Sequence, residues 1–168
     1  MPNSTIILGA DPGTSRAGYG LIKKEDDTLS LLAYGCVEIR TARNHLANLL
    51  ILYDSFMDII KKHRPDVLAI EKLFFFKNAK TITKVSEARG VIILAALKSG
   101  LEIKEFTPLQ IKQAVSAYGR ANKQAVQKMV RLILSLDKDP QPDDAADALA
   151  AAICCANSTQ TGLWGTAS

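Results

Sequence analysis

The sequence is poor in the residues that build disulfide frameworks and histidine-based sites. Among its 168 residues are three cysteines, of which Cys154 and Cys155 are adjacent and Cys36 is distant, and there is no CxxC pair. This excludes a disulfide scaffold and a cysteine-rich zinc site. The two histidines, His45 and His63, leave little material for a His-rich metal centre or a Ser/His/Asp triad. These absences are typical of a reduced, cytoplasmic protein.

Long apolar runs and targeting features are also missing. No stretch approaches the ~18 apolar residues of a membrane span, and residues 1–5 lack the basic start of a signal peptide. We therefore expect no membrane association. The length and the 48% hydrophobic content predict a single globular domain over residues 1–157. Residues 158–168 are rich in Ser, Thr and Gly and are expected to form a flexible C-terminal tail.

The modest net charge of +4 conceals an uneven distribution. Residues 61–131 contain 15 of the 21 Lys and Arg but only five of the 17 Asp and Glu, a local balance of +10. The rest of the chain therefore carries −6. A basic middle indicates a surface for a polyanion, beside a separate acidic feature. A solvated lysine-rich surface explains the same charge, so charge alone does not decide.

Hydrophobic periodicity predicts three strands followed by alternating helices and strands. We expect strands at 6–10, 16–24, 29–39, 66–71 and 102–106, and helices at 43–63, 78–98, 108–118, 122–136 and 143–157. Gly100 is expected to cap the second helix, and Thr107 and Gln110 form a capping-box pattern before the third. This order predicts an α/β fold with a five-stranded mixed sheet flanked by helices on both faces.

Four carboxylates occupy unusual places in this pattern. Asp11 and Glu71 follow two apolar strands, at the sheet edge where open α/β sheets bind ligands. Asp144 and Asp147 lie three apart at the start of the last helix and share one face. The rest of that helix is rich in alanine, which allows a close approach to the sheet. The pattern favours convergence of all four acids.

Each acid also has an ordinary structural explanation. Asp11 before Pro-Gly could form a turn, and Asp143 or Asp144 could be an N-cap. Glu71 could pair on the surface with Lys72 or Arg89. Taken together, four converging carboxylates repel one another and need a counter-charge, which hard divalent cations such as Mg²⁺ supply. Two such ions can activate water for phosphodiester hydrolysis, so the pattern indicates a nuclease.

Four segments stand in a fixed order along the chain: ILGADPGTS at 7–15, AIE at 69–71, EARG at 87–90 and DAADALA at 144–150. In this order and spacing they resemble the motifs of the RuvC family of Holliday junction resolvases, over about residues 5–157. The resemblance implies a ribonuclease H-like three-layer fold for the nuclease domain at 1–157. It also implies a homodimer that binds four-way junction DNA and resolves it by paired symmetric nicks, in recombination and repair.

The resemblance assigns the family's catalytic, metal-binding acids to Asp11, Glu71, Asp144 and Asp147. It implies Mg²⁺ as the cofactor, two ions per active site, with Mn²⁺ as a substitute. A branch-migration motor complex is a further partner that the family suggests. This sequence departs from the pattern in one place, because Asp143 precedes Asp144 and doubles the acid. The spacing favours Asp144 as the ligand and leaves Asp143 as a substitute or an assistant.

The resemblance also places DNA contacts outside the acids. The family's lysines near the site fall on Lys112 and Lys123, which spacing alone would assign to a solvated helix surface. Its functional aromatic falls on Phe74, the first of three consecutive phenylalanines. The alternative is that Phe74 and Phe76 are core residues and only Phe75 is exposed. A track of Lys77, Lys80 and Lys84 could contact phosphates, or form a solvated helix face.

Three rival functions share parts of this pattern. Asp11-Pro12-Gly13-Thr14 also resembles the phosphate loop of actin-like ATPases, but those enzymes need a second domain that 168 residues do not supply, and no GxxxxGK[ST] loop is present. A ribonuclease H uses the same carboxylates on RNA–DNA hybrids. A non-catalytic DNA-binding module is the third rival, although a protein that only binds has no reason to keep four repelling carboxylates.

Overall fold

A computed structural model describes residues 4–39, 44–74, 79–116 and 121–158. Its strands form one mixed sheet in the order β3-β2-β1-β4-β5. The strands are β1 (Ser4–Asp11), β2 (Arg16–Glu25), β3 (Thr28–Glu38), β4 (Val67–Glu71) and β5 (Glu102–Phe106). The helices are α1 (His45–His63), α2 (Ala79–Lys98), α3 (Pro108–Ser116), α4 (Lys123–Ile133) and α5 (Asp143–Ser158). The predicted order of elements and the mixed sheet are confirmed.

The sheet combines an antiparallel half with a parallel half. β1 pairs antiparallel with β2, and β2 with β3, through tight connections. β4 lies parallel to β1, and β5 lies parallel to β4. The register pairs Ala10 with Ile70, so the next residues, Asp11 and Glu71, end neighbouring strands at the same edge. Parallel pairing therefore brings two of the four acids to one edge of the sheet.

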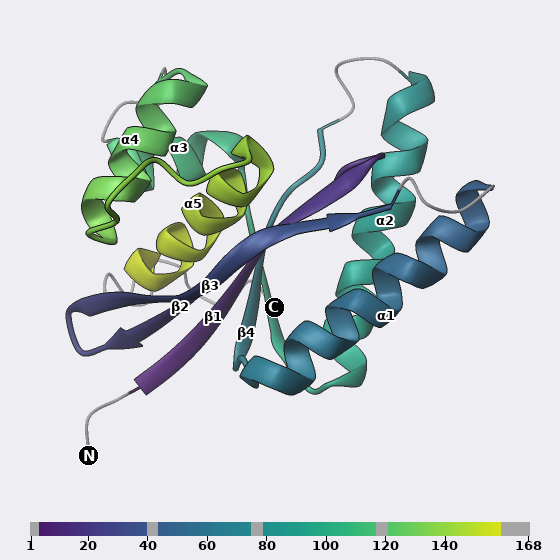
Figure 1. Cartoon of the computed structure of the whole chain (residues 1–168), viewed down its shortest axis with the longest axis horizontal. Coiled ribbons are helices and arrows are strands. Elements are labelled where there is room, and N and C mark those ends of the chain that lie inside the picture. Colours follow the sequence, from purple (N-terminus) through teal and green to yellow (C-terminus); the bar gives the residue numbers. More distant parts are fainter. Residues whose placement is uncertain (1–3, 40–43, 75–78, 117–120, 159–168) are drawn as a thin grey trace, which may run out of the picture.

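Each face of the sheet carries its own hydrophobic core. Because side chains alternate along a strand, Ile7 of β1 points to one core and Leu8 to the other. The first core contains residues of α3, α4 and α5, and the second contains residues of α1 and α2. Figure 1 shows this three-layer arrangement, with the sheet between the two groups of helices.

The helix ends follow local signals in the sequence. Gly100 adopts the expected left-handed conformation, with φ of 79°. The amide of Thr107 donates to Gln110 Oε1 at 2.8 Å, and the amide of Gln110 donates to Thr107 Oγ1 at 3.1 Å, which confirms the capping box. The fourth helix ends at Ile133 rather than at residue 136, because Ser135 has a φ of 53° that does not continue a helix.

The C-terminal helix α5 reaches Ser158, so the first residue of the tail predicted at 158–168 is helical, and the rest of that tail lies outside the described residues. The end of the third predicted helix, at residues 117–118, lies outside them as well. Within the described ranges, no helix is long and apolar enough to cross a membrane.

Helix α5 packs unusually close to the sheet. A Cβ atom built on Gly9 of β1 would lie 1.9 Å from the carbonyl oxygen of Ala148. Alanines make up much of the helix, and Leu149 and Ile153 are fully buried against the strands. Removing each of these two side chains from water stabilises the fold by roughly 1.5–3 kcal/mol. The backbone contact therefore depends on a missing side chain at Gly9.

Replacing Gly9 by alanine is expected to destabilise the protein by about 1–3 kcal/mol, because the helix or the strand must shift to admit the methyl group. The measurement is the urea midpoint of unfolding at an unchanged m-value. Gly90→Ala is the matched control, since a Cβ there meets nothing within 4 Å. In the exposed interior of α2 it should stabilise the protein by roughly 0.5–1 kcal/mol. Equal midpoints for Gly9→Ala and the unmodified protein would contradict the close-packing argument.

Candidate active site

Three elements bring the four predicted acids together at one end of the sheet. Asp11 ends β1 and Glu71 ends β4, while Asp144 and Asp147 lie in the first turns of α5. The start of α5 can reach this edge because β2 carries Gly18 there. A Cβ on Gly18 would lie 2.0 Å from the carbonyl oxygen of Asp144. The sheet edge and the helix start therefore form one acidic notch, made of Asp11, Glu71, Asp144 and Asp147.

Burial and mutual repulsion within the acidic notch change the protonation of its members. The pKa of Asp11 rises to about 8, first because the carboxyl is buried and then because Asp147, Asp144 and Glu71 repel its charge. Burial is also the largest cause of the raised pKa values of Glu71 and Asp147. Asp11 therefore holds a proton at neutral pH unless a cation compensates the charge.

The two predicted lysines lie beside the acidic notch. Lys112 and Lys123 line a pocket of ≈ 430 Å³ together with Glu71 and Asp147. The charge of Lys112 lowers the pKa of both acids, and that of Lys123 lowers the pKa of Asp147 and Asp11. Lys123 Nζ also lies 3.2 Å from Asp143 Oδ2. Both lysines therefore lie beside these acids, and both side chains are exposed.

The other predicted DNA contacts are only partly within the described residues. Phe74 follows β4 and is 51% exposed, so the alternative that it is a core residue is wrong. Lys84 is exposed on α2. Lys77, Phe75 and Phe76 lie outside the described residues, as does the side chain of Lys80.

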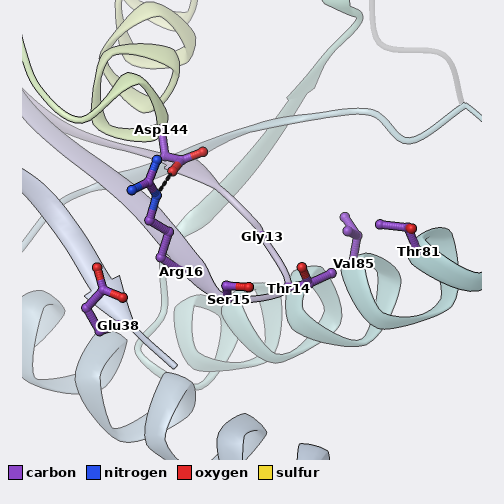
Figure 2. A pocket seen from close by; sticks show the side chains of 8 residues that line it. All are labelled: Gly13, Thr14, Ser15, Arg16, Glu38, Thr81, Val85 and Asp144. Atoms are coloured by element: carbon purple, nitrogen blue, oxygen red, sulfur yellow. Dashed lines mark hydrogen bonds and ion pairs between the residues drawn. The ribbon is translucent and has the colours of Figure 1, made fainter. Parts of the chain in front are cut away.

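Arg16 is a site residue that the sequence pattern did not single out. Its Nε donates to Asp144 Oδ2, and its Nη2 lies 3.1 Å from Asp143 Oδ1. A pocket of ≈ 540 Å³ surrounds this contact, lined by Gly13, Thr14, Ser15, Arg16, Glu38, Thr81, Val85 and Asp144. Figure 2 shows Arg16 extending toward Asp144, with Thr81 and Val85 at the far side of the pocket. The sequence signal for Arg16 was only its place after the Asp-Pro-Gly turn.

Asp143 is the first residue of α5, and its carboxylate pairs with Arg16 and Lys123. The hydrogen bond from Lys123 is the main reason that its pKa is lowered. Asp143 thus stays ionised and holds two cations at the rim of the acidic notch. This gives the doubled acid a definite place in the site.

Neither described hydrogen bond of Arg89 goes to the Glu71 carboxylate, which was the ordinary structural alternative for Glu71. Instead, Arg89 Nε donates to the main-chain oxygen of Glu71 at 3.1 Å, and Arg89 Nη2 donates to Glu105 Oε2. The amide of Lys72 donates to the main-chain oxygen of Phe106 at 2.8 Å. These contacts join the ends of β4 and β5. They leave the Glu71 side chain to line the pocket that it shares with Lys112 and Lys123.

The donor set of the acidic notch fits a hard divalent cation. Its four side chains offer only carboxylate oxygens, the ligands that Mg²⁺ and Mn²⁺ prefer. In the described part of the chain, however, no group of three or more His, Cys, Asp or Glu side chains is arranged to hold an ion as the side chains stand. Asp144 instead faces the guanidinium of Arg16.

Comparison with known proteins gives a consistent result. The family model described as "Crossover junction endodeoxyribonuclease RuvC" matches residues 7–155. Proteins of that name from Heliobacterium modesticaldum and Ruminiclostridium cellulolyticum are 49% and 50% identical to this chain. Each match covers 94% of this chain, and 98% and 95% of the respective relatives.

A solved structure agrees with the sequence relatives. The structure of T. thermophilus RuvC in complex with Holliday junction substrate superposes with a TM-score of 0.88 at 30% identity. The match covers 94% of this chain and 96% of that one. The predicted ribonuclease H-like fold is therefore confirmed. With a family model that spans most of the chain and relatives near 50% identity, the chain belongs to the RuvC family of crossover junction endodeoxyribonucleases.

Proposed function

We propose that this chain is a Mg²⁺-dependent, structure-selective endonuclease that resolves four-way DNA junctions by paired symmetric nicks. The observation that carries the proposal is the acidic notch, in which carboxylates from β1, β4 and α5 raise one another's pKa beside exposed lysines. The junction-bound structure of a 30% identical relative supports the choice of substrate.

Asp11, Glu71, Asp144 and Asp147 are the residues that would hold the cofactor, two Mg²⁺ or Mn²⁺ ions per site. When bound, such ions activate water and stabilise the leaving oxygen of the phosphodiester. From two strand ends and the start of one helix, the four carboxylates would balance the charge of these ions. The expected products are 5′-phosphate and 3′-hydroxyl ends.

Residues around the acidic notch bind and orient the DNA. Lys112 and Lys123 line the same pocket as Glu71 and Asp147, and their ammonium groups suit contact with a backbone phosphate. The exposed ring of Phe74 follows Glu71 by three residues and is suited to stacking on an unpaired base. Lys84, exposed on α2, is suited to a further phosphate contact. We include Lys77 and Lys80 as phosphate contacts from the sequence pattern alone.

A homodimer fits a substrate with two-fold symmetry, because each active site cuts one strand. Exposed leucines favour α1 and α2 as the interface: Leu46 (73%) and Leu50 (62%) share one face of α1, and Leu94 (52%) and Leu97 (56%) share one face of α2. The two helices pack together on the same side of the sheet (Figure 1). A branch-migration motor complex is a further partner that we include from the family alone.

Cleavage of different substrates tests the function directly. In Mg²⁺, we expect a four-way junction to be nicked in symmetric pairs, while linear duplex and RNA–DNA hybrid stay intact. Asp11→Asn should lower junction cleavage by at least roughly 10³-fold, because it removes a charge that the cofactor needs. Junction binding, measured by gel shift, should change little.

Asp137→Asn is the control for this substitution, since Asp137 is an exposed acid in the loop before α5. It should cut at the normal rate. Equal cutting of linear duplex would refute junction selectivity, and cutting confined to the hybrid would indicate a ribonuclease H. If the protein bound the junction but did not cut it in Mg²⁺ or in Mn²⁺, it would be a non-catalytic DNA-binding module.

The raised pKa of Asp11 predicts a pH dependence of metal binding. Since Asp11 is protonated at pH 7 and a ligand must be a carboxylate, Mg²⁺ binding should release protons. Affinity should rise from pH 6 to 8 and level off above, by up to roughly ten-fold per pH unit. Titration calorimetry in buffers of different ionisation enthalpy measures both effects. Binding without proton release at pH 7 would contradict this prediction.

The same shift has a consequence for stability without metal. Folding raises the pKa of Asp11 from 3.8 to about 8, so the native state binds the proton more tightly than the unfolded chain. In EDTA, the free energy of unfolding should therefore fall as the pH rises from about 4 to about 8. Asp11→Asn should reduce this fall.

A charge among the exposed leucines of α1 and α2, which are Leu46, Leu50, Leu94 and Leu97, should break the dimer. We expect Leu94→Glu to elute as a monomer in size-exclusion chromatography with light scattering, because a carboxylate in an apolar interface remains unpaired. Leu132→Glu is the control, since Leu132 is 62% exposed on α4, on the other side of the sheet. A dimeric Leu94→Glu variant would exclude this part of α2 from the interface.

A further inference from the structure

Arg16 makes the contact in the site that the proposed metal chemistry does not explain. The residue lies at the start of β2, 128 positions before the acid that its Nε binds at the start of α5. A second nitrogen of the same guanidinium lies 3.1 Å from Asp143 Oδ1. The planar guanidinium thus spans two consecutive carboxylates, a geometry that lysine does not reproduce.

The bound acid belongs to the acidic notch electrostatically. Asp144 is among the charges that raise the pKa of Asp11, so the two carboxylates lie close enough to repel each other. Arg16 supplies positive charge to Asp144 within the pocket shown in Figure 2. While Asp144 Oδ2 accepts from Arg16 Nε, that oxygen is occupied, so a cation that takes the same oxygen must displace the guanidinium.

The surrounding charges do not provide a substitute partner for Asp144. Lys123 bonds to Asp143, and Lys112 acts on Glu71 and Asp147. Glu38 lines the same pocket as Arg16 and carries the opposite charge. Among the contacts of the described residues, Arg16 is thus the cation bound to Asp144. The side chain of Arg16 is 41% exposed, so it has room to leave.

We propose that Arg16 is a positioning residue that holds Asp144 in the metal-free protein and gives it up when a divalent cation binds. The proposal rests on the metal site of the proposed function. Asp143 keeps the guanidinium nearby during the exchange, because it binds the second nitrogen.

The exchange is tested by Mn²⁺ titration of the full chain without DNA, followed by electron paramagnetic resonance. Arg16→Gln should bind Mn²⁺ roughly five-fold more tightly than the unmodified protein, because a partly exposed ion pair no longer competes. Arg16→Lys, which keeps the charge but not the fork, should lie between the two. Lys23→Gln removes a cation from the same strand that pairs with Glu25, and should leave the affinity unchanged.

A double-mutant cycle separates direct competition from the general loss of a positive charge. In an Asp144→Asn background, Arg16→Gln should no longer tighten Mn²⁺ binding. The proposal would be overturned if Arg16→Gln tightened Mn²⁺ binding equally with Asp144 intact and in the Asp144→Asn background. It would also be overturned if Arg16→Gln did not tighten Mn²⁺ binding in the otherwise unmodified protein. If neither the unmodified protein nor Arg16→Gln binds Mn²⁺, the metal site itself fails. Binding by the unmodified protein with no effect of Arg16→Gln overturns the exchange alone.

Discussion

The contact between α5 and the sheet is the constraint on which the site depends. Gly9 and Gly18 remove side chains from the path of the helix, and the alanines of α5 let its backbone approach the strands directly. Only this approach brings the start of α5 to the ends of β1 and β4. A helix at the usual spacing of bulky side chains would leave Asp144 and Asp147 too far from Asp11. The packing of small residues is therefore a requirement of the chemistry as well as of the core.

Close packing also brings the four carboxylates together, and nearby cations offset their mutual repulsion. The acidic notch concentrates negative charge in a partly buried place, and Asp11 responds by holding a proton. Lys112 and Lys123 compensate charge beside Glu71 and Asp147, and Arg16 compensates the charge of Asp144. The basic middle of the chain, with its balance of +10, supplies both lysines, while three of the four acids belong to the remainder at −6. The small net charge is thus the sum of two opposed features that lie side by side.

Local patterns in the sequence were sufficient for most of the fold. Helical periodicity, the capping box at Thr107 and the left-handed Gly100 each depend on residues only a few positions apart, so their positions could be predicted. The ends of β1 and β2 were predictable because turn residues follow both strands. The fourth helix was predicted too long, since the apolar pattern continues past the point where Ser135 turns the backbone. The positions of the four acids in the pattern of strands and helices indicated their convergence, whereas only the resemblance to the RuvC family indicated the two lysines.

The partners of the site residues were decided by tertiary structure alone. Nothing in the local sequence relates Arg16 to Asp144, which lies 128 positions away, or sends Arg89 to the main chain of Glu71 rather than to its carboxylate. The protonation of Asp11 likewise depends on burial and on charges from three separate elements. The sequence by itself determined the elements, their order and the identity of the acids, because periodicity and turn chemistry act between neighbours. Ion pairs and pKa values act through space, so they exist only once the chain has folded.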